Sequence, residues 1–143
     1  MDDPYDLDRF VTAQDGTYDR ALAELARGAK TGHWMWFVFP QIAGLGYSAM
    51  SHRYAISGLP EARSYLAHPV LGPRLIECAR VVAATEGRTA TEIFGSVDAQ
   101  KLHSSMTLFH RAAPEQVAFG DILDRFFDGQ PDPATEERLR PTG

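Results

Sequence analysis

Apolar residues recur through most of the chain at intervals of three and four positions, which is the spacing of one face of an α-helix. Near the C-terminus, for example, Phe119, Ile122, Leu123 and Phe126 follow this spacing. No two neighbouring segments show the alternation of apolar and polar residues that predicts paired β-strands. The pattern therefore predicts a mainly α fold class. We expect one compact multihelical domain over residues 1–143, built from short helices that glycines and prolines separate.

Capping residues, glycines and prolines predict where these helices begin and end. The predicted caps are Asp6, Ser48, Ser96 and Asp132, together with a capping box formed by Thr89 and Glu92. The predicted helices span residues 6–16, 17–27, 48–56, 61–67, 97–112, 115–128 and 133–139, with a longer helix from His68-Pro69 to about Thr85 and a short turn that ends at Gly95. Residues 1–5 and 141–143 are expected to fray.

The segment Lys30–Gln41 contains both tryptophans of the chain. Its six consecutive apolar residues, Trp34–Phe39, have no period, so they are compatible with a strand or a short helix, of which we favour the helix. Pro40 ends either element. Aromatic runs usually form core, but the polar residues Lys30, His33 and Gln41 also make this segment a candidate pocket wall. The two roles are compatible.

The formal net charge of -5 argues against general binding to nucleic acids or anionic membranes, although a local basic pocket for a small anion is compatible with it. The single cysteine, Cys78, cannot form an intramolecular disulfide and is expected to be a small core residue. The N-terminus lacks the features of a secretory signal, and no apolar run approaches the roughly 18–20 residues of a membrane span. We therefore expect a cytoplasmic protein without a membrane anchor.

Four polar residues of the predicted helix 97–112 form the first candidate site. Asp98, Lys101, Ser104 and Ser105 lie near one helix face because of their spacing. Lys101 could bind an anion, the two serines could hydrogen-bond to it, and Asp98 could act as a base or accept a sugar hydroxyl. The alternative is a solvated face with an Asp98–Lys101 pair that contributes a few tenths of a kcal/mol.

The aromatic segment supplies the second candidate site. His33 is the best general acid or base because imidazole titrates near neutral pH, although a purely structural histidine fits the sequence as well. Trp34 and Trp36 are expected to form a stacking wall beside Lys30 and Gln41. Farther along the chain, Arg53 and Tyr54 could add a phosphate contact and a stacking contact, or could be an exposed arginine and a core tyrosine.

Other motifs argue against familiar activities. The segment Gly44–Ala49 matches the pattern G-x-G-x-x-G/A, but it lacks the preceding tight strand, the second parallel strand and the acidic residue of a dinucleotide site. The five histidines have no spacing typical of a metal site, and Ser104-Ser105 lacks the G-x-S-x-G motif of serine hydrolases. We therefore predict no metal and no cofactor.

Several long motifs, in order along nearly the whole chain, resemble the bacterial domain-of-unknown-function family eighteen-ten. The segments that carry this resemblance are Asp6–Phe10, Gly32–Phe37, Phe39–Gln41, Tyr54–Ile56, Tyr65–Leu75, Ile93–Gly95 and Lys101–Phe109. The resemblance implies a compact, mostly helical cytosolic protein without an established activity. Members are sometimes labelled calpastatin, which conflicts with the aromatic core and capped helices expected here, because a calpain inhibitor would be polar and disordered until bound.

The aromatic-proline segment, followed far along the chain by a lysine-to-methionine helix, also remotely resembles the NADAR superfamily. That resemblance implies chemistry on NAD and ADP-ribose, including cleavage of N-glycosidic bonds in ADP-ribosylated guanine, but it transfers no catalytic residue. The leading hypothesis is a small-ligand enzyme or sensor for a nucleotide or ADP-ribose-like molecule, with N-glycosidic hydrolysis as the preferred reaction. The alternatives are a non-catalytic module that binds a small anion or a protein partner, and motifs that only specify the fold.

Overall fold

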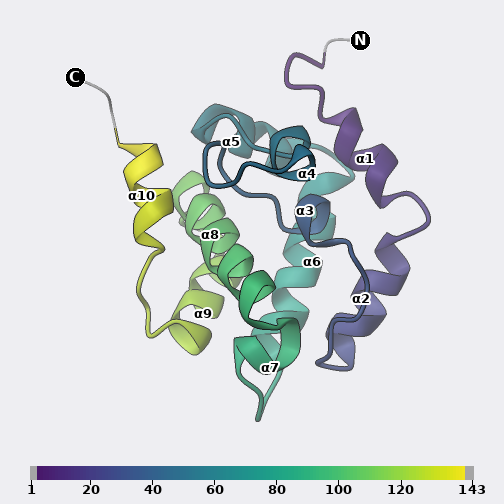
Figure 1. Cartoon of the computed structure of the whole chain (residues 1–143), viewed down its shortest axis with the longest axis vertical. Helices are drawn as coiled ribbons and strands as arrows, with labels where there is room; N and C mark the ends of the chain where they lie inside the picture. Colours follow the sequence, from purple (N-terminus) through teal and green to yellow (C-terminus); the bar gives the residue numbers. More distant parts are fainter. Residues whose placement is uncertain (1–2, 141–143) are drawn as a thin grey trace.

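The computed structural model describes residues 3–140, and this part of the chain forms ten α-helices (Figure 1). They are α1 Asp8–Gln14, α2 Tyr18–Ala26, α3 Met35–Val38, α4 Ala49–Arg53, α5 Leu59–Ala67, α6 Leu71–Ala84, α7 Ala90–Phe94, α8 Ser96–Ala112, α9 Val117–Phe126 and α10 Pro133–Leu139. Within residues 3–140 there is no β-strand, only an isolated parallel bridge between Ile42 and Ile56. The predicted mainly α, multihelical fold class is confirmed.

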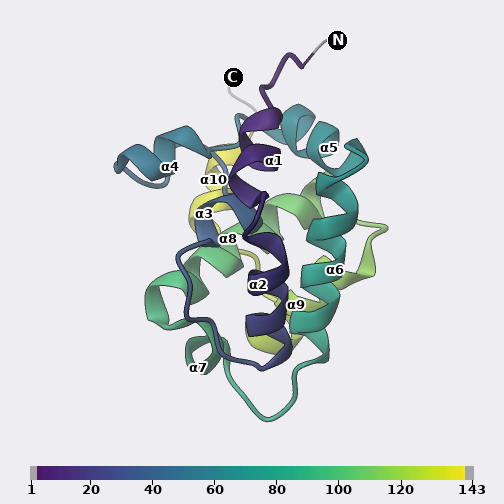
Figure 2. The same cartoon turned by 90° about the vertical axis from the view of Figure 1, so that its right-hand side faces the viewer.

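Helix α8 is the longest helix and lies in the middle of the bundle, where α5, α7, α9 and α10 pack against it (Figure 1). Its residues Leu102, Met106 and Phe109 are completely buried. Helix α6 packs against α2, α5 and α9 on the other side of the molecule, as Figure 2 shows. The apolar faces of α8 and α6 thus supply much of the core, in agreement with their three- and four-residue spacing.

A chain of aromatic rings connects four helices through the core. Phe10 of α1 contacts Tyr65 of α5 with ring centroids 5.1 Å apart, Tyr65 contacts Phe109 of α8 at 5.4 Å, and Phe109 contacts Phe119 of α9 at 5.9 Å. The buried amide of Gln14 donates to the Phe37 carbonyl and to Tyr65 Oη, so its polar group is satisfied. These tilted and edge-on ring contacts stabilise the packing of helices that are far apart in sequence.

Several local predictions are confirmed. The aromatic segment forms the short helix α3. Ser48 Oγ and an Asp132 carboxylate oxygen accept hydrogen bonds from backbone amides of the first turns of α4 and α10. Thr89 and Glu92 form the predicted capping box of α7. These caps satisfy amides that have no partner within the helix.

Other helix boundaries were predicted wrongly. Asp6 does not cap α1, because it has a φ of 51° and the Asp3 carboxylate accepts the hydrogen bonds from the Leu7 and Asp8 amides. Ser96 is already the first residue of α8, since Gly95, with a φ of 82°, makes the sharp turn from α7.

Two further helices are shorter than expected, and one expectation falls partly outside the described residues. Helix α4 ends at Arg53 rather than near Ile56, and α9 begins at Val117 instead of Glu115. The Asp3 carboxylate accepts a hydrogen bond from the start of α1 and Tyr5 packs against the core, and the fraying expected for residues 1–5 stays a prediction. Residues 1–2 and 141–143 lie outside the described part of the chain.

The close contact between α5 and α6 depends on Gly72. An added Cβ at Gly72 would lie 2.0 Å from the Leu66 carbonyl oxygen, whereas a Cβ at Gly58 would find Pro60 Cδ at an ordinary 3.7 Å. We expect Gly72→Ala to lower the free energy of unfolding by roughly 1–3 kcal/mol because the backbone of α5 must move. Urea unfolding measures this, with Gly58→Ala as the matched control. Equal stability of the two variants would contradict this packing account.

Candidate functional site

Three charged side chains from two distant segments meet on one face of the molecule. Lys30 follows α2, and Asp98 and Lys101 lie on the first turns of α8. Lys30 Nζ lies 2.7 Å from Asp98 Oδ2, and Lys101 Nζ lies 3.0 Å from Asp98 Oδ1. The side chains of Lys30, Asp98 and Lys101 are 7%, 19% and 16% exposed. The carboxylate is thus held between two ammonium groups, and the three groups carry one net positive charge.

Aromatic side chains border this ion cluster. Lys101 Nζ lies 4.1 Å from the ring centroid of Trp36, and Lys30 Nζ lies 5.1 Å from that of Trp34. Both distances are within the range of cation–π attraction. A small cavity of about 100 Å³ lies against the cluster, and its lining residues are Lys30, His33, Met35, Trp36, Asp98 and Lys101. The site therefore combines cations, one carboxylate, an imidazole and apolar surface.

The two lysines keep Asp98 ionised. Burial by itself raises the pKa of Asp98, but the hydrogen bonds and the charges of Lys30 and Lys101 outweigh burial and hold the pKa below its ordinary value. At neutral pH Asp98 is therefore a negative charge and a hydrogen-bond acceptor. A carboxylate with a lowered pKa is a weak general base, so Asp98 is better suited to accept hydroxyl hydrogen bonds or to stabilise a positive charge.

The structure brings together five of the predicted site residues: Lys30, His33, Trp36, Asp98 and Lys101. His33 is exposed at this cavity. The two segments that the sequence singled out, residues 30–41 and 98–105, therefore do meet in space.

Two other members of the aromatic segment lie away from the cavity lining. Trp34 is 1% exposed, and its Nε1 donates to Glu24, so its indole lies in the core. Gln41 is half-buried, and its carbonyl accepts from the Ile56 amide at the isolated bridge. Of the two tryptophans expected to form a stacking wall, only Trp36 lines the cavity.

Ser104 and Ser105 occupy a different environment from Asp98 and Lys101. Ser104 Oγ is buried and lies 2.8 Å from Thr135 Oγ1 of α10. Ser105 is completely buried, and its Oγ has no hydrogen-bond partner among the described residues. The spacing of the four residues suggested one polar face, but α8 is covered by other helices, so the two serines point into packed interfaces.

Arg53 and Tyr54 lie at the end of α4. Arg53 is exposed, with its guanidinium carbon 5.6 Å from the ring centroid of Tyr54. Tyr54 is buried and packs against Phe10 and Phe37. The structure thus favours the alternative interpretation of an exposed arginine beside a core tyrosine.

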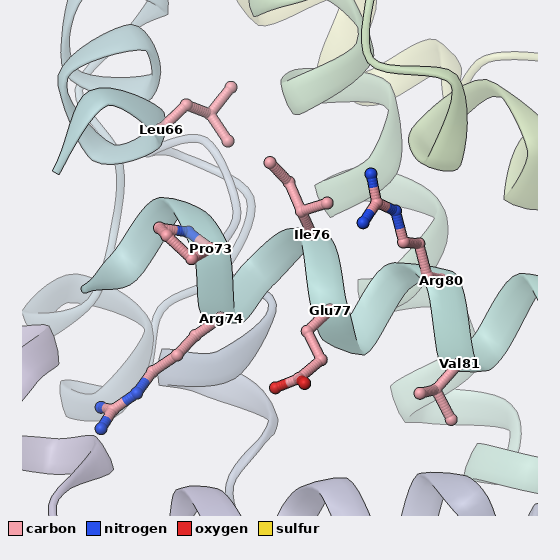
Figure 3. A pocket seen from close by; sticks show the side chains of 7 residues that line it. All are labelled: Leu66, Pro73, Arg74, Ile76, Glu77, Arg80 and Val81. Atoms are coloured by element: carbon pink, nitrogen blue, oxygen red, sulfur yellow. The ribbon is translucent and has the colours of Figure 1, made fainter. Parts of the chain in front are cut away.

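A larger open groove of about 680 Å³ lies along α6 (Figure 3). Two of its three charged side chains have partners within the fold, since Arg74 lies 4.7 Å over the Tyr18 ring and the Tyr18 hydroxyl donates to Glu77, while Arg80 is exposed. None of the predicted site residues lines this groove. We therefore place the candidate site at the smaller cavity, where charged groups converge.

The described part of the chain has neither a cluster of metal ligands nor a membrane-spanning helix. Within residues 3–140, no three or more His, Cys, Asp and Glu side chains gather in a way that could hold a metal ion. No helix in the same range is long and apolar enough to cross a membrane.

Comparison with known proteins identifies the family. The model of a family described as "Protein of unknown function (DUF1810)" matches residues 4–139. The chain belongs to the DUF1810 family. Among solved structures, this DUF1810 chain is similar to the conserved hypothetical protein Rv1873 from Mycobacterium tuberculosis, with a TM-score of 0.96 and 50% sequence identity over 98% of this chain and 100% of that one. Among curated proteins, no sequence matches.

Glu24, which the sequence analysis missed, holds the loop that carries Lys30 and His33 in this DUF1810 protein. Glu24 is 3% exposed, and its Oε1 accepts hydrogen bonds from the Thr31 amide at 2.7 Å, the Gly32 amide at 2.8 Å and Trp34 Nε1 at 3.0 Å. The Lys30 amide donates to the Ile93 carbonyl of α7 at 2.8 Å. Together these bonds fix the loop that presents Lys30 and His33.

Sequence signals for these residues do exist. Glu24 lies three positions after Ala21 and directly before Leu25, so it falls on the buried face of α2. Of the fourteen Lys and Arg residues, only Lys30 and Lys101 are lysines. The structure brings both to Asp98.

Glu24 should contribute to the free energy of unfolding at neutral pH, and this contribution should decrease in acid. Burial raises the pKa of Glu24, but the hydrogen bonds from Gly32, Thr31 and Trp34 lower it to about 2, from an ordinary value of 4.5. A carboxylate whose pKa is lower in the folded state stabilises the fold above its unfolded pKa, and this contribution is lost as the pH falls toward the folded pKa. Glu24→Ala should therefore lower the free energy of unfolding by about 3 kcal/mol at neutral pH, because three donors lose their acceptor.

Urea unfolding of the wild type, Glu24→Ala and Glu24→Gln at several pH values measures this contribution. The difference between wild type and Glu24→Gln should shrink as the pH falls below about 4.5. Glu86→Ala, at an exposed position, is the control and should change stability by less than about 0.5 kcal/mol. An equal effect of Glu24→Gln at all pH values would refute the assignment of an ionised, hydrogen-bonded carboxylate.

Proposed function

We propose that this protein binds a small phosphate-bearing ligand of the nucleotide or ADP-ribose class at the cavity beside Lys30, Asp98 and Lys101. The observation that carries the proposal is the meeting of the two lysines of the chain at one small cavity with an aromatic wall. Ammonium groups are strong partners for phosphate oxygens, and their attraction is larger where water is partly excluded. The net positive charge of the cluster contrasts with the net charge of -5 of the whole chain.

The size of the cavity limits which part of the ligand it holds. A volume of about 100 Å³ is well below the roughly 300–1,000 Å³ of pockets that enclose a drug-sized ligand. The cavity therefore accommodates one sugar or phosphate group, the group bonded to it lies at the opening beside the lysines, and the remainder of the ligand lies over the surface near the exposed His33.

The reaction that we propose is hydrolysis of an N-glycosidic bond. The ionised Asp98 would stabilise the positive charge that develops on the sugar ring as the bond to the base breaks. Water would then add to the anomeric carbon, His33 would accept a proton from this water and later release it to solvent, and the departing base would take up a proton from solvent. The resemblance of the aromatic-proline segment and the lysine-to-methionine helix to the NADAR superfamily supports this class of substrate.

Ligand-induced thermal stabilisation tests the binding proposal. We expect ADP-ribose or a related nucleotide, but not an uncharged nucleoside, to raise the unfolding midpoint. A ligand at 100 times its dissociation constant adds about 2.7 kcal/mol, which corresponds to several degrees for a domain of this size. Lys101→Ala should abolish the shift, whereas Arg111→Ala, which removes a more exposed cation from the far end of α8, should preserve it. No shift with any phosphate compound, in a protein that unfolds cooperatively, would exclude the proposal.

Product analysis by chromatography separates an enzyme from a binding module. The wild type should release free base from an ADP-ribosylated nucleoside, and Asp98→Asn should reduce the rate by at least about 100-fold, because the charge that stabilises the transition state is lost. His33→Ala should lower the rate about 100-fold at unchanged stability. Ligand binding without any product would assign the alternative role, a non-catalytic module for a phosphate-bearing ligand.

A further inference from the structure

The carboxylate at the centre of the proposed site restricts which phosphate compounds the site can accept. Each oxygen of Asp98 faces one lysine, at 2.7 Å from Lys30 Nζ and 3.0 Å from Lys101 Nζ. A bare phosphate that approaches the lysines also approaches this negative charge, and the partly buried position of Asp98 weakens the screening of their repulsion. The cluster is therefore a poor site for a simple inorganic anion.

The unused hydrogen-bonding groups of the cluster indicate a different ligand. An ammonium group has three donors, and a carboxylate has about four acceptor positions. Lys30 donates to Asp98 and to the Gly32 carbonyl, and Lys101 donates to Asp98. Among the contacts of residues 3–140, this leaves about three N–H donors on the lysines and about two acceptor positions on Asp98. A matching ligand offers hydroxyl donors and anionic oxygens close together.

We infer that Asp98 is a specificity-determining residue that selects a ribosyl phosphate over a phosphate group without neighbouring hydroxyls. The sugar hydroxyls donate to Asp98, while the phosphate oxygens accept from Lys30 and Lys101. The partly exposed Trp36 lines the same cavity and gives the C–H groups of a sugar ring an aromatic surface. This inference rests on the proposed function and adds that the hydroxyl groups are required for recognition.

Two simple probes isolate the contribution of the hydroxyls: ribose 5-phosphate and methyl phosphate, which are both phosphate monoesters. Because the chain contains two lysines, NMR of lysine-labelled protein reports binding through two side-chain signals. Wild type should bind ribose 5-phosphate at least about tenfold more tightly than methyl phosphate, as expected for two additional net hydrogen bonds. ADP-ribose serves as the larger reference ligand.

Asp98→Asn keeps the size of the side chain and removes its charge. This variant should bind methyl phosphate more tightly than wild type, by about threefold or more, and the preference for ribose 5-phosphate should fall close to one. A preference that stays at the wild-type ratio overturns the inference. So does a parallel loss of affinity for both probes, which would mean that Asp98 only aligns the lysines.

A second variant covers the case in which Asp98→Asn fails to fold. Asp98→Glu retains the charge but moves the carboxylate by one methylene, so methyl phosphate should stay weak while the preference for ribose 5-phosphate declines. Tighter binding of methyl phosphate by Asp98→Glu overturns the inference. If wild type binds ADP-ribose but does not prefer ribose 5-phosphate to methyl phosphate, the inference fails and the proposed function stands. If no phosphate compound shifts either lysine signal, both fail.

Discussion

The hydrogen bonds to the buried carboxylate of Glu24 determine the course of the segment on which the candidate site depends. Two backbone amides and the Trp34 indole all donate to the same oxygen, Glu24 Oε1. The Trp34 indole is buried, so the loss of its acceptor would cost about 1–3 kcal/mol, and the same oxygen also accepts from the amides of the exposed Thr31 and the half-buried Gly32. The hydrogen bonds from these donors to the ionised carboxylate fix the backbone in a turn. The positions of Lys30 and His33, on either side of the turn, follow from it.

Helix α8 supplies the second fixed element because each of its sides has a different partner. Leu102 and Met106 face the apolar core, while Ser104 bonds to Thr135 of α10 and Thr107 accepts from the amide of Asp132, the cap of α10. Asp98 and Lys101 are left facing the loop after α2. Groups that converge from a packed helix and a hydrogen-bonded turn need little reorganisation before a ligand binds, which favours affinity.

Most of the fold could be predicted from the sequence because it is encoded in local patterns. The three- and four-residue spacing predicted the helices, and residues such as Ser48, Thr89 and Asp132 marked their starts correctly. Predictions failed where a distant or additional partner replaced the local one. Asp3 takes the capping role expected of Asp6, for example.

The candidate site was predicted less completely for the same reason. Spacing on a helix gives the direction of a side chain, but it does not reveal which neighbouring element covers it. Ser104 was therefore grouped with Lys101, although α10 covers it. The pair Lys30 and Asp98 joins residues that are distant in sequence, and no periodic pattern predicts such a contact. Glu24 was missed because a glutamate is usually exposed, and its three hydrogen-bond donors lie seven to ten residues farther along the chain.

Two cations of the molecule differ in how many of their N–H donors have acceptors within the described residues. All five N–H donors of the Arg9 side chain have acceptors: four carbonyls, of Tyr5, Asp6, Arg53 and Ala55, and the Glu61 carboxylate. Arg9 thus links α1 to the end of α4 and the segment after it. No N–H donor of its side chain remains for a ligand.

Lys101 has one hydrogen-bonded acceptor within the described residues, Asp98, and borders a cavity. A partly buried ion cluster of this kind is weak evidence for stability, because the loss of hydration offsets much of the attraction between the charges. In the proposed function, its remaining N–H donors are available to the phosphate of the ligand. The compact ammonium group also suits a small cavity, since it directs its donors without the planar geometry that a guanidinium imposes. In the proposed function, the chemistry and the position of Lys101 both suit a contact with the phosphate, whereas Arg9 serves the fold.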